Sequence, residues 1–132
     1  MTSIEGAQSP RVLVVDDDPD LLRAIGDALH DEGLNVETAG NGLEALGIAR
    51  ACKPDLVVLD VMLPVVGSAH VATRLRQLLS ETIPLLVITA DGRAADKARQ
   101  LGAYAYLRKP FELAQLLAEV RRGLGATGAY AR

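Results

Sequence analysis

Short runs of strand-forming residues alternate along this chain with longer segments that have the spacing of helices. The runs are rich in Val, Leu and Ile, which predicts buried strands, and they fall at residues 11–15, 35–39, 55–60, 83–90 and 103–107. Between them, apolar or alanine residues recur at helical intervals, and these predicted helices fall at residues 20–33, 41–52, 68–81, 92–102 and 112–125. No other feature of the sequence restricts the possible folds as strongly.

A strand followed by a helix, repeated five times, predicts one parallel sheet with helices on both faces. Right-handed crossovers leave few topologies for such a chain. We therefore expect an α/β fold, a three-layer sandwich with a doubly wound (βα)5 sheet of five parallel strands. The 132 residues fit one domain, which we place at residues 11–124, with a flexible N-terminal tail at 1–10 and a C-terminal tail or linker start at 125–132.

The charge balance argues against a nucleic-acid partner. The chain has 14 Lys and Arg against 17 Asp and Glu, a net charge of −3, whereas a nucleic-acid binder typically has a basic face. Residues 1–10 lack the pattern of a signal peptide, and no apolar run approaches the roughly 18 residues of a membrane span. We expect a cytoplasmic protein with no direct contact with nucleic acid or membrane.

The single cysteine and the two histidines predict no metal site of their own. Cys52 cannot form a disulfide framework alone, and we expect it to be a buried helix residue. His30 and His70 lack the further ligands that a zinc site needs. All three are interpreted as ordinary helix residues.

Chemically capable side chains follow the predicted strands directly. In an open parallel α/β sheet, ligands bind outside the carboxyl ends of the strands. The polar residues at these ends are Asp16, Asp17 and Asp18, then Asp60, then Thr89, and finally Arg108 and Lys109. The sequence therefore predicts acids, a hydroxyl and an amine at one edge of the sheet.

The acids indicate a divalent cation. Converging carboxylates repel one another, which raises the pKa of at least one of them unless a cation is present. Oxygen-rich sites favour Mg²⁺. Asp60 ends an apolar run with a single carboxylate, whereas Asp18 stands before Pro19 and suits a helix cap. We predict a site for Mg²⁺ or Mn²⁺ at this edge.

Lys109 and Thr89 can complete such a site. Pro110 fixes the backbone after Lys109, and the end of the last strand would aim the ammonium toward Asp60. An amine beside a carboxylate can pair with it or with a phosphoryl oxygen. Thr89, followed by the small Ala90, either packs as a β-branched core residue or donates its hydroxyl to a ligand.

The chain resembles the receiver domain of two-component response regulators, the CheY-like family, over about residues 11–124. The matching segments are "VLVVDDDP", "DLVVLDVMLP", "LLVITA", "GAYAYLRKPF" and the amphipathic helix after them. Each is weak alone, but in this order and on these strand ends they are specific. The resemblance implies a flavodoxin-like fold and a signalling phosphoacceptor that catalyses only its own phosphorylation and dephosphorylation, rather than an enzyme.

The resemblance also implies how the acids divide their roles. Asp60 resembles the aspartate that takes a phosphoryl group from the phosphohistidine of a sensor kinase or a histidine phosphotransfer protein. Asp17, Asp60 and the backbone carbonyl of Met62 resemble the direct Mg²⁺ ligands, and Asp16 the residue that acts mainly through bound water.

The remaining residues resemble the parts of a switch. Lys109 resembles the lysine that pairs with phosphoryl oxygens, and Thr89, next to Ala90, the switch hydroxyl. Tyr106 resembles the aromatic residue that turns inward when the hydroxyl moves. The face built from residues 92–124 would then bind a downstream protein, an effector domain of the same protein, or a second copy in a homodimer.

One loop departs from the family pattern. After the proline of "VMLP" stands "VVGS" at residues 65–68, so the turn glycine is displaced by one position. Met62 and Asp91 flank the expected phosphoryl site. Because methionine cannot orient a water molecule, we expect slow loss of phosphate.

An enzyme is the strongest alternative. "VVDDDPD" also resembles the first motif of haloacid-dehalogenase-like phosphatases, in which Asp16 would be the nucleophile and Asp18 the general acid and base. Against this, Asp20 stands where that motif has Thr or Val, and no acidic pair follows Lys109.

Two further alternatives keep the same fold. A flavodoxin would need a phosphate loop rich in backbone donors after the first strand, where this chain has three acids that repel phosphate. A degenerate receiver would serve only as an interaction module, although every expected site residue is present.

Overall fold

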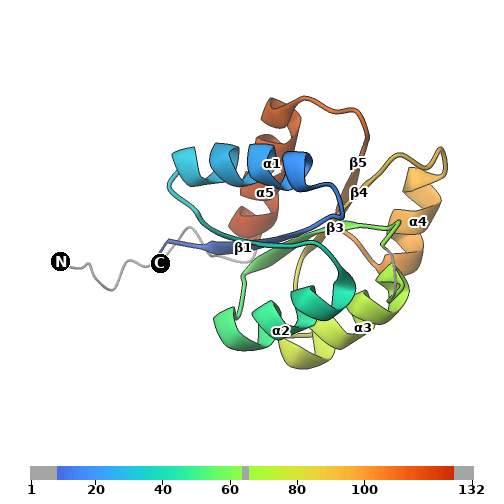
Figure 1. Cartoon of the computed structure of the whole chain (residues 1–132). Coiled ribbons are helices and arrows are strands. Elements are labelled where there is room, and N and C mark those ends of the chain that lie inside the picture. The colour runs from blue at the N-terminus through green and yellow to red at the C-terminus, as the bar shows by residue number, and fades with distance from the viewer. Residues whose placement is uncertain (1–8, 64–65, 127–132) are drawn as a thin grey trace.

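Five parallel strands form one sheet in the order β2–β1–β3–β4–β5 (Figure 1). The computed structural model describes residues 9–63 and 66–126. The strands are β1 (Arg11–Val15), β2 (Asn35–Ala39), β3 (Leu56–Asp60), β4 (Leu85–Thr89) and β5 (Ala105–Arg108). The helices are α1 (Pro19–Asp31), α2 (Gly42–Cys52), α3 (Ser68–Leu78), α4 (Ala94–Leu101) and α5 (Leu113–Ala126). The predicted doubly wound α/β fold is confirmed.

Alternate residues of the central strands face opposite layers, as the twofold repeat of a strand requires. One face of the sheet packs on α1 and α5, and the other on α2, α3 and α4 (Figure 1). In β3, Val57 and Leu59 join the core under α2 and α3, whereas Leu56 and Val58 join the core under α1 and α5. Because both faces are covered, β1, β3 and β4 are almost entirely buried and read as continuous apolar runs.

The register of the two central strands determines where the acids lie. Val15 of β1 is paired with Leu59 of β3. The residues that follow, Asp16 and Asp60, therefore emerge side by side at the carboxyl edge of the sheet, although they are far apart in the sequence.

The first helix begins as the sequence predicts. Asp18 is its N-cap, and Asp18 Oδ1 accepts hydrogen bonds from the amides of Asp20 and Leu21, at 3.0 and 3.3 Å. Pro19 occupies the first turn, where a missing N–H is tolerated. The cap turns the chain sharply after Asp16 and Asp17 and keeps both at the sheet edge.

Several element boundaries differ from the predicted ones. Helix α3 ends at Leu78 rather than at 81, because the hydroxyl of Ser80 accepts the amide of Thr82 at 3.0 Å and offers the backbone a turn instead. Strand β4 begins only at Leu85, after a proline that cannot donate to a ladder. Cys52 is half-buried at the last position of α2, so the prediction of a buried cysteine is wrong.

The last helix approaches the sheet closely at one glycine. A Cβ on Gly123 would lie 2.5 Å from Tyr104 Oη and 2.6 Å from Leu56 Cδ1. The Tyr104 hydroxyl donates to the Glu119 carbonyl at 2.6 Å, and the Arg122 guanidinium lies 5.3 Å from the centre of the Tyr104 ring. This end of α5 is thus fitted tightly against β3 and the residue before β5. The helix reaches Ala126, two residues past the domain boundary expected at 124.

Candidate functional site

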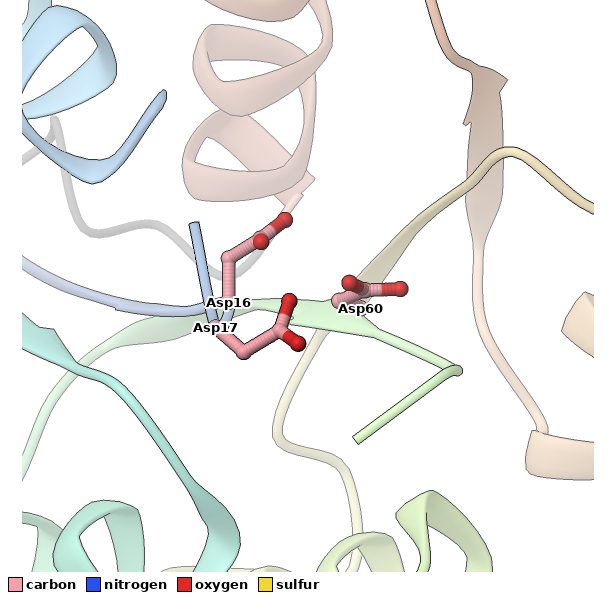
Figure 2. A group of neighbouring side chains, drawn as sticks. All are labelled: Asp16, Asp17 and Asp60. Carbon is pink, nitrogen blue, oxygen red and sulfur yellow. The ribbon is translucent and has the colours of Figure 1, made fainter. Parts of the chain in front are cut away.

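Three carboxylates meet at the carboxyl edge of the sheet. Figure 2 shows the side chains of Asp16 and Asp17, which follow β1, extending toward Asp60 at the end of β3. One oxygen from each carboxylate lies within 4.8 Å of the others. The adjacent strands therefore build the predicted cluster of oxygen ligands.

The three carboxylates differ in burial and in their hydrogen bonds. Asp17 is exposed, whereas Asp16 is 0% and Asp60 3% exposed. Asp16 Oδ1 accepts the amide of Asp18 at 2.9 Å, and Asp60 Oδ1 accepts the amide of Met62 at 3.0 Å. Each buried carboxylate is thus oriented by a tight turn that follows it, and its second oxygen remains for another partner.

Lys109 is the cation that faces these second oxygens. Its Nζ lies 2.7 Å from Asp16 Oδ2 and 3.2 Å from Asp60 Oδ2. The Lys109 amide donates to the Thr89 carbonyl at 2.8 Å, which ties the residue after β5 to the end of β4. The side chain is 22% exposed, so Lys109 keeps partial contact with water.

Two opposing effects act on the pKa of Lys109. Burial lowers it, but the hydrogen bond to Asp16 and the charges of Asp60 and Asp16 raise it by more. The net result is a pKa above the ordinary value of 10.5. The ammonium therefore stays charged throughout the neutral range and offsets part of the repulsion among the carboxylates.

The donor set is also chemically suited to a divalent cation. All three ligand groups are carboxylates, and hard cations such as Mg²⁺ prefer oxygen. One lysine does not neutralise three acids, so the cluster keeps a negative charge that a divalent cation would offset.

The residues expected to form a switch lie at different depths. Thr89 is fully buried at the end of β4, and its Oγ1 accepts the amide of Asp91 at 3.0 Å. Ala90 is exposed. Tyr106 lies in β5 with 43% of its surface exposed, so its ring is not inside the site. Met62 also faces solvent, with 60% exposed.

Some contacts at the site were not foreseen from the sequence. The pairing of Lys109 with Asp16 is one, since only Asp60 was expected as its partner. Ser68 Oγ donates to the Val61 carbonyl at 3.0 Å and so fastens the loop that follows Asp60. A serine at a helix start is a capping signal, but the pattern does not reveal which carbonyl its hydroxyl reaches.

Other predicted features are not part of the site. His30 and His70 are exposed residues of α1 and α3. The loop that departs from the family pattern is only partly described, because Val65 and the preceding Pro64 lie outside the described residues. Among helices in the described ranges, none has the length and apolar character required to cross a membrane.

Comparison with known proteins gives a consistent result. Residues 12–121 match the family model of the response regulator receiver domain. The transcriptional regulatory protein PrrA of Mycobacterium leprae is 43% identical over 128 residues, which cover 96% of this chain and 54% of that protein. The master transcriptional regulator RpaA of Synechocystis is 39% identical, covering 89% of this chain and 50% of that protein. The chain thus spans about half the length of these curated relatives.

A solved structure shows the same architecture. The chemotaxis protein CheY4 of Vibrio cholerae superimposes with a TM-score of 0.81 at 31% identity, covering 89% of this chain and 100% of that one. Sequence and fold therefore point to the same group of proteins.

Proposed function

Because the chain belongs to the response regulator receiver domain family, we propose that Asp60 accepts a phosphoryl group from the phosphohistidine of a sensor kinase or a histidine phosphotransfer protein. The family serves in signalling rather than as free-standing enzymes. The observation that carries the proposal is the position of Asp60, almost fully buried between a second buried carboxylate and Lys109. A carboxylate so placed is a pre-oriented nucleophile with a cation beside it.

The transfer step is a displacement at phosphorus. A carboxylate oxygen of Asp60 forms a bond to phosphorus as the bond between phosphorus and the histidine nitrogen breaks, and that nitrogen keeps the bonding pair. The turn amide of Met62 holds the Asp60 carboxylate in place. Lys109, now 3.2 Å from Asp60 Oδ2, offsets the charge on the phosphoryl oxygens.

We assign the cation site to Asp16, Asp17 and Asp60 together with the backbone carbonyl of Met62. Asp17 and Asp60 are the direct ligands in this assignment, and Asp16 acts mainly through bound water. Held there, Mg²⁺ or Mn²⁺ would supply positive charge to offset the charge on the phosphoryl oxygens. The all-oxygen donor set, and the negative charge that a single lysine leaves on three carboxylates, support this assignment.

Phosphorylation then supplies the signal. It adds about −1.5 to −2 charges and strong acceptor oxygens at Asp60. In our proposal the Thr89 hydroxyl and the region of Ala90 respond, and Tyr106 turns inward from its exposed position. The face formed by residues 92–124 is then presented to a downstream protein, to an effector domain of the same protein, or to a second copy.

The relatives' names speak of transcriptional regulation, and this chain matches about half of each. A DNA-binding output is therefore a proposal for a longer protein and not a property of these residues. The cytoplasmic location likewise stays a prediction.

The phosphatase alternative fits the site less well. It requires Asp18 as general acid and base, but Asp18 Oδ1 is engaged as the α1 cap. The same carboxylate group would have to hold the helix start and move a proton.

The proposal is tested with acetyl phosphate and Mg²⁺. We expect intact-mass measurement to show one acid-labile phosphoryl group on the wild type and none on Asp60→Asn. Asp20→Asn, at an exposed carboxylate paired with Arg23 on α1, is the matched control and should be phosphorylated like the wild type. Lack of a phosphoryl group on the wild type would favour the degenerate receiver. Hydrolysis of phosphate esters lost in Asp16→Asn but not in Asp60→Asn would favour the phosphatase.

The switch is tested separately by light scattering after size exclusion. Mg²⁺ with beryllofluoride mimics the phosphorylated state. A change in mass or in elution of the wild type that Asp60→Asn does not show would support a switch read out through the 92–124 face. Identical profiles would argue against self-association and leave a different partner as the output.

A further inference from the structure

The peptide group that joins Val61 to Met62, directly after Asp60, is held at both of its polar ends. Its N–H donates to Asp60 Oδ1 at 3.0 Å, and its carbonyl accepts the hydroxyl of Ser68 at 3.0 Å. Because a peptide group is planar, its C=O and N–H turn together as one body. A bond that fixes the direction of the carbonyl therefore also fixes the direction of the amide that orients Asp60.

Ser68 reaches this carbonyl from a rigid support. It is the first residue of α3, and in the first turn of that helix the amide of Val71 donates to the Gly67 carbonyl at 3.1 Å. Val71 is fully buried in the core under α2 and α3. The N-cap is Gly67, which has no side chain to cap the helix, and the Ser68 hydroxyl bonds instead to the carbonyl of Val61. The helix thus serves as the fixed point from which the peptide group is held.

The residue after Asp60 is held from a second direction by the sheet. The Val61 amide donates to the Ile88 carbonyl at 3.3 Å, beyond the last paired residues of β3 and β4. That bond joins two backbones, whereas the bond from Ser68 depends on a side chain and can be removed by one substitution. The Ser68 contact is also direct, so its effect on Val61 does not depend on the course of the loop between them.

We propose that Ser68 is a positioning residue for phosphoryl transfer. Its hydroxyl fixes the plane of the peptide group after Asp60, so that the Met62 amide keeps the carboxylate in one orientation. In that orientation Asp60 Oδ2 faces Lys109 at 3.2 Å. A nucleophile held in one orientation reacts faster than one that samples several. The inference rests on the proposed function, because it assumes that Asp60 accepts the phosphoryl group.

The first measurement tests the positioning by NMR in the unphosphorylated chain. We expect Ser68→Ala to shift the Met62 amide proton toward the value of an unstructured chain, because the peptide group can then turn away from Asp60 Oδ1. Thr73→Val is the matched control, since Thr73 Oγ1 donates to the Ala69 carbonyl at 3.1 Å on the same helix. This control also loses a bond from a hydroxyl to a carbonyl, but it should leave the Met62 signal in place.

The second measurement is the rate of phosphorylation by acetyl phosphate at saturating Mg²⁺, followed by intact mass. We expect Ser68→Ala to lower the maximal rate about tenfold. The half-saturating concentration of acetyl phosphate should not change, because Ser68 acts on the nucleophile rather than on the donor. Ser68→Thr keeps a hydroxyl and should retain the wild-type rate, as should Thr73→Val. Urea unfolding of each variant shows that it is folded under the conditions of the assay.

The outcomes distinguish this inference from the proposed function. An unmoved Met62 signal or a wild-type rate in Ser68→Ala would overturn the positioning role while leaving Asp60 as the phosphoacceptor. Equal slowing in Ser68→Ala and Ser68→Thr would overturn it as well, since the hydroxyl would then not be the group that matters. Absence of phosphorylation of the wild type would overturn the proposed function, and the inference with it.

Discussion

Strand β3 ends in a residue of the candidate site and strand β5 is followed directly by another, but the two strands differ greatly in burial. Every residue of β3 is buried between β1 and β4. Strand β5 lies at the edge of the sheet, and its residues alternate between half-buried and exposed. Asp60, the proposed nucleophile, is thus carried by a fully buried strand, and its counter-ion Lys109 follows a more open strand at the sheet edge.

The two strands should therefore differ in how easily they move. A strand with few buried contacts can shift at lower free energy than one in the core. In the proposed switch, a change of charge at Asp60 would leave β3 in place and move Lys109, β5 and the helices beside it. Substitutions at Leu59, Leu107 and Lys109 test the contrast between the strands. Substitutions in α5 and at Tyr104 test how firmly α5 is packed beside β5.

The largest expected effect comes from the same truncation in both strands. Leu59→Ala, at a fully buried position of β3, should lower the free energy of unfolding by roughly 3–4 kcal/mol, from lost burial and the cavity left behind. Leu107→Ala, at a half-buried position of β5, should lower it by about 1 kcal/mol. Urea unfolding measures both values, and equal losses of unfolding free energy would show that β3 and β5 do not differ in this way.

Removing the link between the strands should have the next largest effect. Lys109→Met leaves Asp16 and Asp60 buried without their cation, and without Mg²⁺ we expect a loss of about 2–3 kcal/mol, below that of fully buried pairs because Lys109 is partly exposed. Saturating Mg²⁺ should narrow the gap to the wild type, since the variant lacks the ammonium that repels a cation at the carboxylates and so gains more stability from binding one. Lys53→Met, at an exposed lysine, is the control. A loss that Mg²⁺ does not reduce would contradict the proposed site.

A pair of glycines in α5 shows how tightly the flank is fitted. Gly123→Ala places a methyl group against Tyr104 and Leu56, and overpacking of this kind should cost about 2 kcal/mol. Gly125→Ala meets nothing within 4 Å and should stabilise the helix by about 0.5 kcal/mol. Thermal unfolding of the two variants gives the comparison. Opposite signs are expected, and equal shifts would refute the close approach.

The smallest effect is expected for Tyr104→Phe. Loss of the hydrogen bond to the Glu119 carbonyl should cost about 1 kcal/mol at neutral pH. Tyr106→Phe, at an exposed ring, should change stability by less than about 0.5 kcal/mol in either direction.

The Tyr104 variant should also change the pH dependence of stability. Burial, assisted by the charge of Glu119 and opposed by Arg122, raises the pKa of Tyr104 well above its ordinary value of 10.0. The unfolded chain releases this proton from about pH 10 upward while the folded chain keeps it, so stability falls as pH rises above that value. Tyr104→Phe should remove part of this fall in unfolding experiments between about pH 9 and 11. An unchanged slope would show that the hydroxyl is not buried as described.

Lys109 contributes to the same alkaline range. Its folded pKa is raised above 10.5, so its stabilising effect is complete below the unfolded pKa and is lost as pH rises through the folded one. The fall that remains in Tyr104→Phe should therefore be reduced again by Lys109→Met.

The sequence was sufficient for the arrangement of strands and for the edge at which the site lies. Apolar runs such as "DLVVLD" can be buried on both faces only in a covered parallel sheet, and their carboxyl ends then carry Asp16 and Asp60 together. The cap by Asp18 followed from its position before Pro19, because that interaction is local.

Contacts between residues that are far apart in the sequence could not be predicted from the sequence pattern. Nothing in the pattern distinguishes the buried Asp16 from the exposed Asp17, because alternation along a strand does not say which side the last residue takes. The pairing of Lys109 with Asp16 depends on the depth of both side chains. The close approach of Gly123 to Tyr104 and Leu56 depends on how a helix meets the sheet, which no single segment encodes.

The position of Lys109 has a consequence for the making of the protein. A ribosome adds Asp16, Asp17 and Asp60 well before Lys109, so a nascent chain holds the mutually repelling charges before it holds the residue that balances them. Pairing of β1 with β3 brings Asp16 and Asp60 together. The positive charge of Lys109, which offsets these two carboxylates, is present only when the segment after β5 has emerged. During translation, the last strand to appear therefore closes the site electrostatically as well as completing the sheet.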